Sequence, residues 1–228
     1  MAFKDLVEGV KSKVRLSSKA MPAHVAFAVE GFTQESIQTS VEKVRTIASA
    51  AVKLQIPMIT FHLSGAKIDS RQLDLVEALF ASMKDWQELQ QNQTKVNVVG
   101  RWFQLPERII EQIKPVLDAT KDYDRNFLNF CIIYDGQEEI ADAAKLIAKQ
   151  AKLGRIDPEA IDKAVLKEHL YTSYFIPPDI IIKTGKSKRL GGVLLWDSAH
   201  SKVFFAEKEW NDFTQEDFLK AVEWWQSS

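Results

Sequence analysis

The stretch that decides the fold is PPDIIIKTGKSKRLGGVLLWDSAHSKVFF, residues 177–205. An apolar run, Ile180 to Ile182, leads into residues 183–189, where four of the seven side chains are Lys or Arg. Gly185 lets this loop approach a ligand closely. A cationic loop at the end of a buried strand suits an anion, because backbone N–H and ammonium groups can converge on phosphate oxygens. A solvated basic loop that binds nothing is the alternative interpretation.

Strands and helices alternate on both sides of this stretch, which is the pattern of a parallel α/β sheet. Nearly unbroken apolar runs predict strands over residues 24–29, 57–63, 96–99, 127–134, 180–183 and 201–205. Apolar residues at helical spacing predict helices over 36–54, 70–91, 106–117 and 140–148, one that starts at Asp157, and a last one over 214–225. The sequence therefore predicts a single α/β domain with a mainly parallel sheet of about six strands flanked by helices.

Residues 1–20 carry a separate pattern. Apolar side chains recur at helical spacing between cationic ones over residues 3–15, which predicts a short amphipathic helix. This helix can dock on the domain, which is expected to span residues 21–228, or lie on a membrane surface.

Composition narrows the class of protein. The chain has 228 residues and a formal net charge of −1, so nucleic acid is not an expected partner and any anion binding must be local. Cys131 is the single cysteine, which excludes a disulfide framework and favours a reducing, cytoplasmic compartment. No apolar run approaches the ~20 residues of a membrane-spanning helix, and no signal-peptide core follows Met1. Membrane contact is therefore expected only at a surface.

Other motifs point to no catalytic centre. Gly185-Lys186-Ser187 is similar to the end of a P-loop, but Ile180 stands where that motif needs its first Gly. The four histidines have no metal-ligand spacing, and no Gly-x-Ser-x-Gly string is present. Glu30 differs, because it follows the first predicted strand at the edge where open α/β sheets bind ligands. A solvated carboxylate at a strand end is the alternative.

The last predicted helix carries adjacent tryptophans, Trp224 and Trp225. Adjacent residues cannot both face inward from one helix. At least one of the two is therefore expected to contact a partner.

Local strings form a series along residues 22–225: PAHVAFAVEG at 22–31, VVGR with LP at 98–106, LN with Y, G and EI at 128–140, HLYT at 169–172, PD at 178–179, RL at 189–190, LLW at 194–196 and AHS at 199–201. In this order and spacing the series resembles the cis-prenyltransferases, the undecaprenyl diphosphate synthase family. That family extends an allylic diphosphate with isopentenyl diphosphate and Mg²⁺, and holds the growing chain in a hydrophobic tunnel between helices and sheet. The resemblance implies this fold and isoprenoid diphosphates as ligands.

The positions that the resemblance marks as the active site depart from the family's pattern. Glu30 stands where the family has an aspartate, residues 32–35 replace its diphosphate-binding turn, and residues 65–69 replace a Ser/Thr-Glu-Asn-Trp string. The signature Arg-Thr-Ser-Gly-Glu-x-Arg becomes KTGKSKR at 183–189, and Lys202 stands where the family has a metal-binding glutamate. Glu30 is thus a degenerate catalytic position, and no metal ligand is assigned. The diphosphate-binding candidates are Lys183, Thr184, Lys186, Ser187, Lys188, Arg189 and Lys202.

These departures predict a non-catalytic accessory subunit of a heteromeric cis-prenyltransferase, because losing even one preorganised electrostatic group costs about 10² to 10³ in rate. The resemblance supplies the partner, since some members of the family pair a catalytic chain with a non-catalytic homologue. Mg²⁺ is then expected in the complex and not in this chain alone, and a homodimer is also open. The last residues, 224–228, do not match the Arg-x-Gly tail of such accessory chains, so help is expected through the dimer surface.

Two alternatives remain. One is a self-sufficient cis-prenyltransferase in which the cations at 183–189 and Lys202 bind diphosphate partly in place of metal. The other is a non-enzymatic protein that binds polyprenyl lipid.

Overall fold

A computed structural model of the chain describes residues 20–31, 33 and 36–228. The predicted N-terminal amphipathic helix lies outside the described residues. Within them, one six-stranded sheet organises the structure, in the order β3-β4-β2-β1-β5-β6 with every neighbouring pair parallel. The strands are β1 (His24–Ala28), β2 (Met58–His62), β3 (Thr94–Val99), β4 (Asn126–Cys131), β5 (Ile180–Lys183) and β6 (Lys202–Phe205).

The sheet confirms the predicted α/β domain with its parallel strands. Except for β5, the strands differ from the predicted ones by one to three residues at one or both ends, and the largest difference is at β4, which ends at Cys131 and not at Tyr134. Ile133 adopts a left-handed backbone with a φ of 48°, which turns the chain out of the sheet. The backbone N–H of Ile133 is then satisfied by Ser64 Oγ at 2.8 Å instead of by a neighbouring strand.

The helices are α2 (Ile37–Lys53), α3 (Ser70–Met83), α4 (Gln87–Gln91), α5 (Glu107–Thr120), α6 (Gly136–Lys152), α7 (Lys163–Glu168) and α8 (Gln215–Ser227). The single helix predicted over 70–91 is wrong, because the chain turns at the buried Trp86, the N-cap residue of α4. The α-helix predicted from Asp157 is also wrong. Asp157 caps only the 3-10 turn η3 (Pro158–Ala160), and α7 begins at a second cap, Asp162, which accepts the N–H of Val165 at 2.9 Å.

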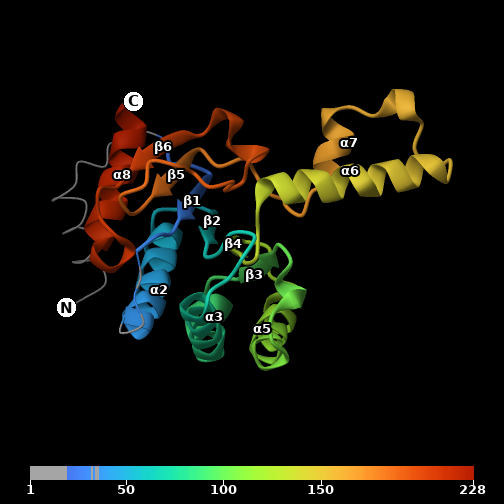
Figure 1. The fold of residues 1–228 in the computed structure, drawn as a ribbon. Coiled ribbons are helices and arrows are strands. Elements are labelled where there is room, and N and C mark those ends of the chain that lie inside the picture. Colours follow the sequence, from blue (N-terminus) through green and yellow to red (C-terminus); the bar gives the residue numbers. More distant parts are fainter. Residues whose placement is uncertain (1–19, 32, 34–35) are drawn as a thin grey trace.

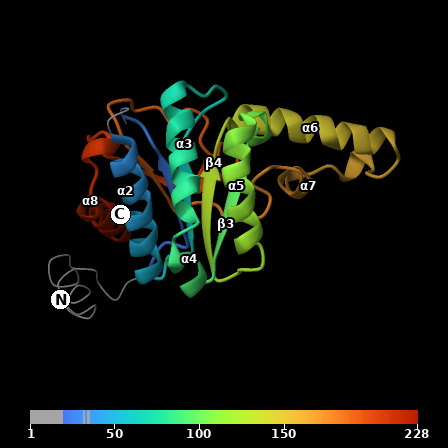
Figure 2. The ribbon, with the colours of Figure 1, turned by 90° about the horizontal axis from the view of Figure 1, so that it is seen from below.

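Helices α2, α3, α5 and α8 cover one face of the sheet, where the main apolar core lies (Figures 1 and 2). The other face carries a smaller buried cluster that includes Met58, Cys131 and Ile181 from the strands and Phe175, Val193 and Leu194 from the segment that crosses them. On that face, the sheet is therefore covered by the connection between α7 and β5 and by the long loop after β5, and not by helices.

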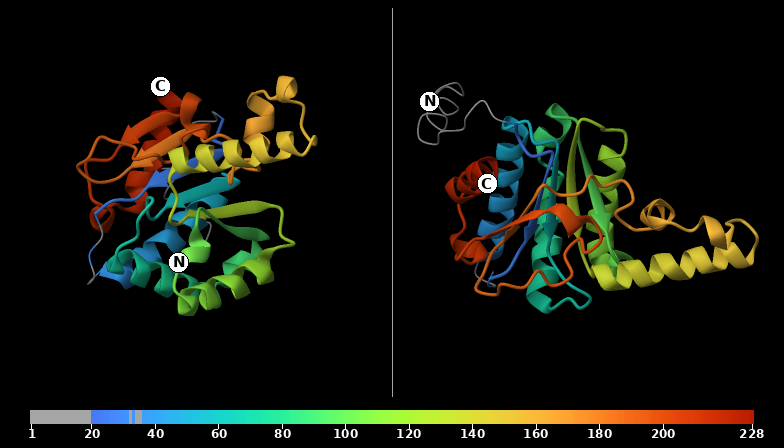
Figure 3. Two further views of the ribbon diagram at one scale, coloured as in Figure 1. Left: turned by 45° about the vertical axis from the view of Figure 1, so that its right-hand side comes forward. Right: turned by 90° about the horizontal axis from the view of Figure 1, so that it is seen from above.

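Helix α6 runs out from the body of the domain and carries α7 back alongside it, forming an arm (Figure 3). Its base is fixed by Asp142, which accepts hydrogen bonds from Tyr171 and from Arg101 Nη2, the latter at 2.7 Å. These bonds hold the pKa of Asp142 well below its usual range. Lys167 on α7 reaches the buried carboxylate of Asp197 at 2.7 Å, which ties the arm to the loop after β5.

Trp224 and Trp225 are both partly buried against the core. The Trp224 ring lies 5.4 Å from that of Phe204, and Lys202 Nζ lies 6.0 Å from the Trp225 ring. A partner contact through either tryptophan stays a prediction. Across the described part of the chain, no helix combines the length and apolarity needed to cross a membrane.

Candidate functional site

The topology of the sheet marks one place for a ligand. From β1 the chain passes to β2 on one side, and from β5 it passes to β6 on the other, while β1 and β5 are neighbours. Ligands of open α/β sheets bind outside the carboxyl ends of the strands at such a switch point. Glu30 follows β1 and Lys183 ends β5, so both candidate residues lie there.

Glu30 and Lys183 form an ion pair across the switch point through Lys183 Nζ and Glu30 Oε2. The Lys183 side chain is 7% exposed and that of Glu30 is 48% exposed. Lys183 Nζ also donates to the carbonyl of Thr184 at 2.6 Å. The ammonium is thus buried between two oxygens, and the carboxylate of Glu30 already has a cation.

The loop after β5 lies in close contact with this ion pair. Thr184 Oγ1 accepts the N–H of Glu30 at 2.9 Å, which fixes the ends of the two strands together. Gly185 has a φ of +86°, and a Cβ atom at this position would lie 2.6 Å from Glu30 Oε2. Only glycine therefore permits both the left-handed backbone and the close approach.

The remaining loop candidates face outward. Lys186, Lys188 and Arg189 are exposed, and Ser187 is half-buried. Lys188 Nζ lies 3.3 Å from Glu207 Oε1 and 5.3 Å from the Phe205 ring. Six of the seven diphosphate-binding candidates thus lie at the end of β5 and in the loop that follows it, with Lys183 and Thr184 buried and the other four at least partly exposed.

Lys202 does not join them. It is the first residue of β6 and pairs with Ile180, three positions before Lys183 in β5. At about 3.3 Å per residue, Lys202 begins roughly 10 Å from the carboxyl end of β5. Its Nζ lies 3.3 Å from Ser228 Oγ, toward the end of α8.

Buried polar groups that the sequence analysis did not single out lie at the carboxyl ends of β2 and β4. His62 donates to the carbonyl of Tyr134 through Nε2 at 3.1 Å, and burial lowers the pKa of this imidazole. Tyr134 donates its hydroxyl to Glu139 at 2.6 Å, and burial raises the pKa of that carboxyl group. No motif marks His62, and Tyr134 and Glu139 enter only as members of the series that resembles the family. The contacts among them leave no local record, because they depend on how the strand ends and α6 meet.

The donor set at the switch point does not fit a resident Mg²⁺ ion. Mg²⁺ in proteins is held by carboxylates and by substrate phosphates. Here Glu30 is occupied by the ammonium of Lys183, and the neighbouring loop is cationic. A divalent cation at Glu30 would have to displace that ammonium group.

Fold and loop together define the class: a parallel α/β protein whose switch point carries a cationic loop of the kind that suits anions. A family model described as "Putative undecaprenyl diphosphate synthase" matches residues 27–228. The chain belongs to this family, the cis-prenyltransferases of isoprenoid biosynthesis.

Individual relatives agree with that assignment. The chain is 33% identical over 221 residues to the tritrans,polycis-undecaprenyl-diphosphate synthase (geranylgeranyl-diphosphate specific) of Methanocaldococcus jannaschii, covering 89% of this chain and 79% of the relative. It is 29% identical to an isoprenyl transferase of Thermotoga maritima, covering 89% and 93% of the two chains. Lavandulyl diphosphate synthase from Lavandula x intermedia, solved with dimethylallyl diphosphate, shares the fold with a TM-score of 0.84 at 24% identity, covering 91% of this chain and 96% of that one.

Proposed function

We propose that the chain is the non-catalytic accessory subunit of a heteromeric cis-prenyltransferase. Its partner would be a catalytic chain of the same family that makes cis-polyprenyl diphosphate from isopentenyl diphosphate and an allylic diphosphate. The observation that carries this proposal is the ion pair between Glu30 and Lys183 beneath Gly185.

The pair argues against turnover for an electrostatic reason. A catalytic site must offer its charges to the reacting groups, and diphosphate departure draws on a metal ion held by carboxylates. Glu30 instead neutralises a lysine of its own chain, and the pair has little exposed surface on its cationic side. Mg²⁺ would accordingly be bound at the partner's site in the complex.

The arm supports a partner surface. Large apolar side chains are exposed on the arm and on the segments beside it, namely Leu146, Leu153, Ile161, Tyr174, Ile176 and Leu195. A groove of about 610 Å³ lies between α6, α7 and residues 195–200. Apolar side chains gathered in this way are typical of association surfaces. A second chain of the family that covers the arm would remove them from water.

One observation favours the alternative of a self-sufficient enzyme. Lys186, Lys188 and Arg189 remain exposed on the loop, where they could hold a diphosphate without metal. The relatives described above also carry the names of enzymes, a diphosphate synthase and an isoprenyl transferase.

Incorporation of radiolabelled isopentenyl diphosphate separates these functions. The chain would be assayed with an allylic diphosphate and Mg²⁺ alone, beside a catalytic homologue from the same organism, and mixed with it. We expect no product from the chain alone and more product from the mixture than from the homologue. Product from the chain alone that is lost in Lys183→Met would establish the self-sufficient enzyme and overturn the proposal. A mixture that forms no complex and makes no more product than the homologue alone would also overturn the proposal and favour lipid binding.

A further inference from the structure

Strand β6 forms an open edge of the sheet on the side away from the arm (Figure 1). Among the described residues, no strand pairs with its outer side, so part of its backbone N–H and C=O groups faces outward. Lys202 on β6 and Lys188 beside it are both exposed. Lysines on an edge strand discourage pairing with a further strand. A strand of another protein is therefore not the expected occupant of this edge.

Aromatic side chains gather along both sides of the β6 edge. Phe204 and Phe205 are successive residues of the strand and therefore point to opposite faces of the sheet. The Phe204 ring lies 5.4 Å from the Trp224 ring of α8, whereas Phe205 is 37% exposed on the other face. Phe204, Trp224 and Trp225 are only partly buried against the core. The domain thus covers part of each ring and leaves the rest to solvent.

Cations accompany these rings. Lys188 Nζ lies 5.3 Å from the Phe205 ring, and Lys202 Nζ lies 6.0 Å from the Trp225 ring. Lys188 is paired with Glu207 at 3.3 Å. Lys186, Arg189 and Lys202 are exposed and form no ion pair with any carboxylate in the described part of the chain. The edge therefore combines partly exposed aromatic rings with positive charge that the domain does not neutralise.

The described chain also begins beside this edge. The carbonyl of Ala20 accepts the Nε2–H of Gln226 at 3.1 Å, and Gln226 follows Trp225 near the end of α8. Four residues separate Ala20 from Arg15, the last cation of the amphipathic pattern at 3–15. A chain of that length spans at most roughly 18 Å. The predicted amphipathic segment is therefore tethered within reach of the aromatic edge.

We propose that the β6 edge, formed by β6, residues 224–227 of α8 and the loop at 183–189, docks on an anionic bilayer surface. Aromatic rings favour the zone between lipid head groups and hydrocarbon, and clustered Lys and Arg side chains are attracted to anionic head groups. A cationic amphipathic segment beside them adds apolar area to the same contact. The three sequence features that the accessory role does not use, namely the loop cations, the paired tryptophans and the N-terminal pattern, thus serve one surface.

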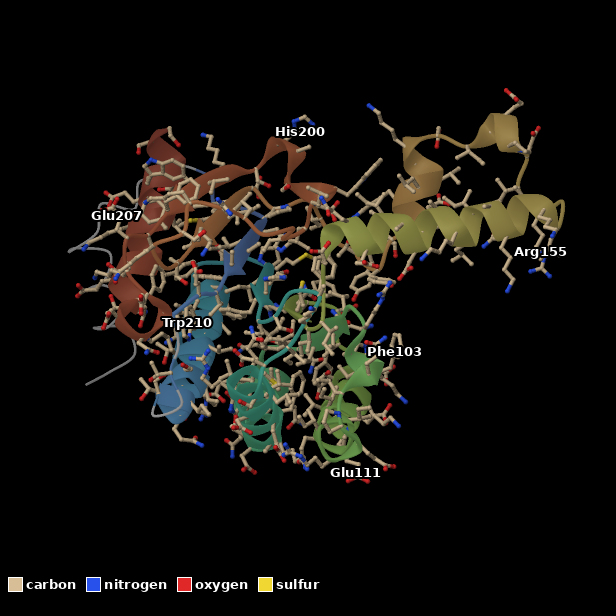
Figure 4. The ribbon with its side chains drawn as sticks, viewed as in Figure 1. Phe103, Glu111, Arg155, His200, Glu207 and Trp210 are labelled. Atoms are coloured by element: carbon tan, nitrogen blue, oxygen red, sulfur yellow. The ribbon has the colours of Figure 1, made fainter. Side chains whose placement is uncertain are left out.

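The position of this edge leaves the arm accessible. Figure 4 shows Glu207, beside the edge, and Arg155, at the end of the arm, on opposite sides of the molecule. A partner chain on the arm and a bilayer at the β6 edge can therefore be bound at the same time. The inference goes beyond the proposed function, since docking on a bilayer needs neither a partner chain nor prenyl transfer.

Co-sedimentation of the full chain with unilamellar vesicles tests the docking face. We expect binding to vesicles of equal parts phosphatidylglycerol and phosphatidylcholine, and little binding to phosphatidylcholine alone. NaCl at roughly 1 M should release the protein, because the Debye length falls to about 3 Å. Inorganic diphosphate, added at constant ionic strength, should not release it. This arm separates docking on lipid head groups from occupation of the loop by a soluble phosphate group.

Phe205→Ser combined with Lys202→Gln should weaken binding to the anionic vesicles about tenfold or more, because it removes one aromatic ring and one cation from the contact. Phe103→Ser combined with Lys145→Gln is the matched control. It removes an exposed aromatic ring and an exposed lysine elsewhere on the molecule, with the same change in net charge, and should bind as the unaltered chain does. Circular dichroism confirms that both variants keep the fold.

A second pair of variants covers the case in which the β6 variant does not fold. Lys186→Gln combined with Arg189→Gln changes only exposed loop residues and should also weaken binding about tenfold. Its control is Lys149→Gln combined with Lys152→Gln, which removes two exposed cations from α6 and should leave binding unchanged.

Three results would each overturn the proposal. The first is no binding to anionic vesicles, which would leave the β6 edge to a protein partner. The second is equal binding by folded variants and their controls, which would assign any attraction to net charge or to residues 3–15 alone. The third is release by inorganic diphosphate. Because the assay contains no partner chain and no allylic diphosphate, its failure would leave the accessory role standing, and product formation by the chain alone would leave the docking face standing.

Discussion

Glu30 and Lys183 each suit diphosphate chemistry, but in this structure their side chains form an ion pair with each other. A cation at the end of β5 and a carboxylate after β1 would both contact a ligand if they were separate. Paired, they stabilise the junction of two neighbouring strands. Residues that align with a family's active-site positions in sequence can thus have a structural role in the folded protein.

Removing the carboxylate should expose the asymmetry of this pair. Glu30→Gln leaves the buried ammonium of Lys183 with only the Thr184 carbonyl, and we expect it to lower the free energy of unfolding by about 1–2 kcal/mol. Adding Lys183→Met should recover part of that loss, because the buried charge is gone. Urea unfolding measures both. Glu207→Gln, which breaks the exposed pair with Lys188, is the control and should cost no more than about 0.5 kcal/mol. An equal, small effect of Glu30→Gln would mean that the pair adds no stability.

His24 makes stability depend on pH. Its Nδ1–H donates to the carbonyl of Ile176, and its Nε2 accepts from Thr60 Oγ1 at 2.8 Å. Burial lowers the pKa of this imidazole from 6.5 to about 4. The unfolded chain therefore takes up the proton first, and this contribution to stability is present above pH 6.5 and lost as the pH falls toward 4.

We expect His24 to account for about 3 kcal/mol of unfolding free energy between pH 7 and pH 4. Urea unfolding across that range measures it, and His24→Gln should flatten the dependence. The exposed His200, replaced in the same way, is the control and should leave the slope unchanged. A slope that His24→Gln does not alter would assign the acid sensitivity to other groups, among them His62.

At the scale of elements, the start of α6 is packed against the loop that follows β5. Gly136 is the first residue of α6, and a Cβ atom there would lie 2.4 Å from Leu195 Cβ and 2.7 Å from the carbonyl oxygen of Gly192. The arm therefore leaves the body of the domain through a contact that admits no side chain.

Gly136→Ala should destabilise the protein although alanine is the better helix former. The steric clash predicts a loss of about 1–3 kcal/mol, measured by thermal or urea unfolding. Gly65→Ala is the matched control, because a Cβ atom at Gly65 meets nothing within 4 Å. Equal stabilities of the two variants would show that the Leu195 loop moves freely to make room.

At the scale of the whole molecule, the body and the arm differ in how far their apolar side chains are exposed. The body buries its apolar residues between sheet and helices, whereas the arm leaves Leu146 on α6 and Leu153, the residue that caps its end, about half exposed. They lie seven residues apart, so they share one side of the helix. A stripe of this kind predicts contact with a second chain.

Leu146→Asp combined with Leu153→Asp should weaken binding of a catalytic homologue by about tenfold or more, since buried apolar contacts dominate interface energies. Biolayer interferometry measures the affinity, and circular dichroism confirms that the fold is kept. Phe103→Ser changes an even more exposed apolar residue that lies off the arm (Figure 4), and it should leave binding unchanged. Unaltered binding by the double variant would place the partner elsewhere.

The parallel sheet and the cationic loop were determined by the sequence alone. Strands that are buried on both faces must be apolar along their whole length, and helices repeat their apolar residues every third or fourth position, so both leave a local record. Residues 183–189 are one continuous stretch of the chain, so the six diphosphate-binding candidates within it necessarily lie close together. The helices wrongly predicted over 70–91 and from Asp157 show where local patterns fail. The chain turns at the buried Trp86 although the apolar spacing continues through it, and Asp162 starts α7 although Asp157 is an equally good N-cap in sequence.

Only the tertiary structure decided what the loop does with its charges. Glu30 and Lys183 are 153 residues apart, and they meet because β1 and β5 are neighbours in the sheet. Strand register placed Lys202 at the opposite end of the strands and aligned Phe27, Phe61 and Phe130 beneath Trp210. Such contacts depend on strand order and register, which bring distant residues together and which no stretch of sequence records locally.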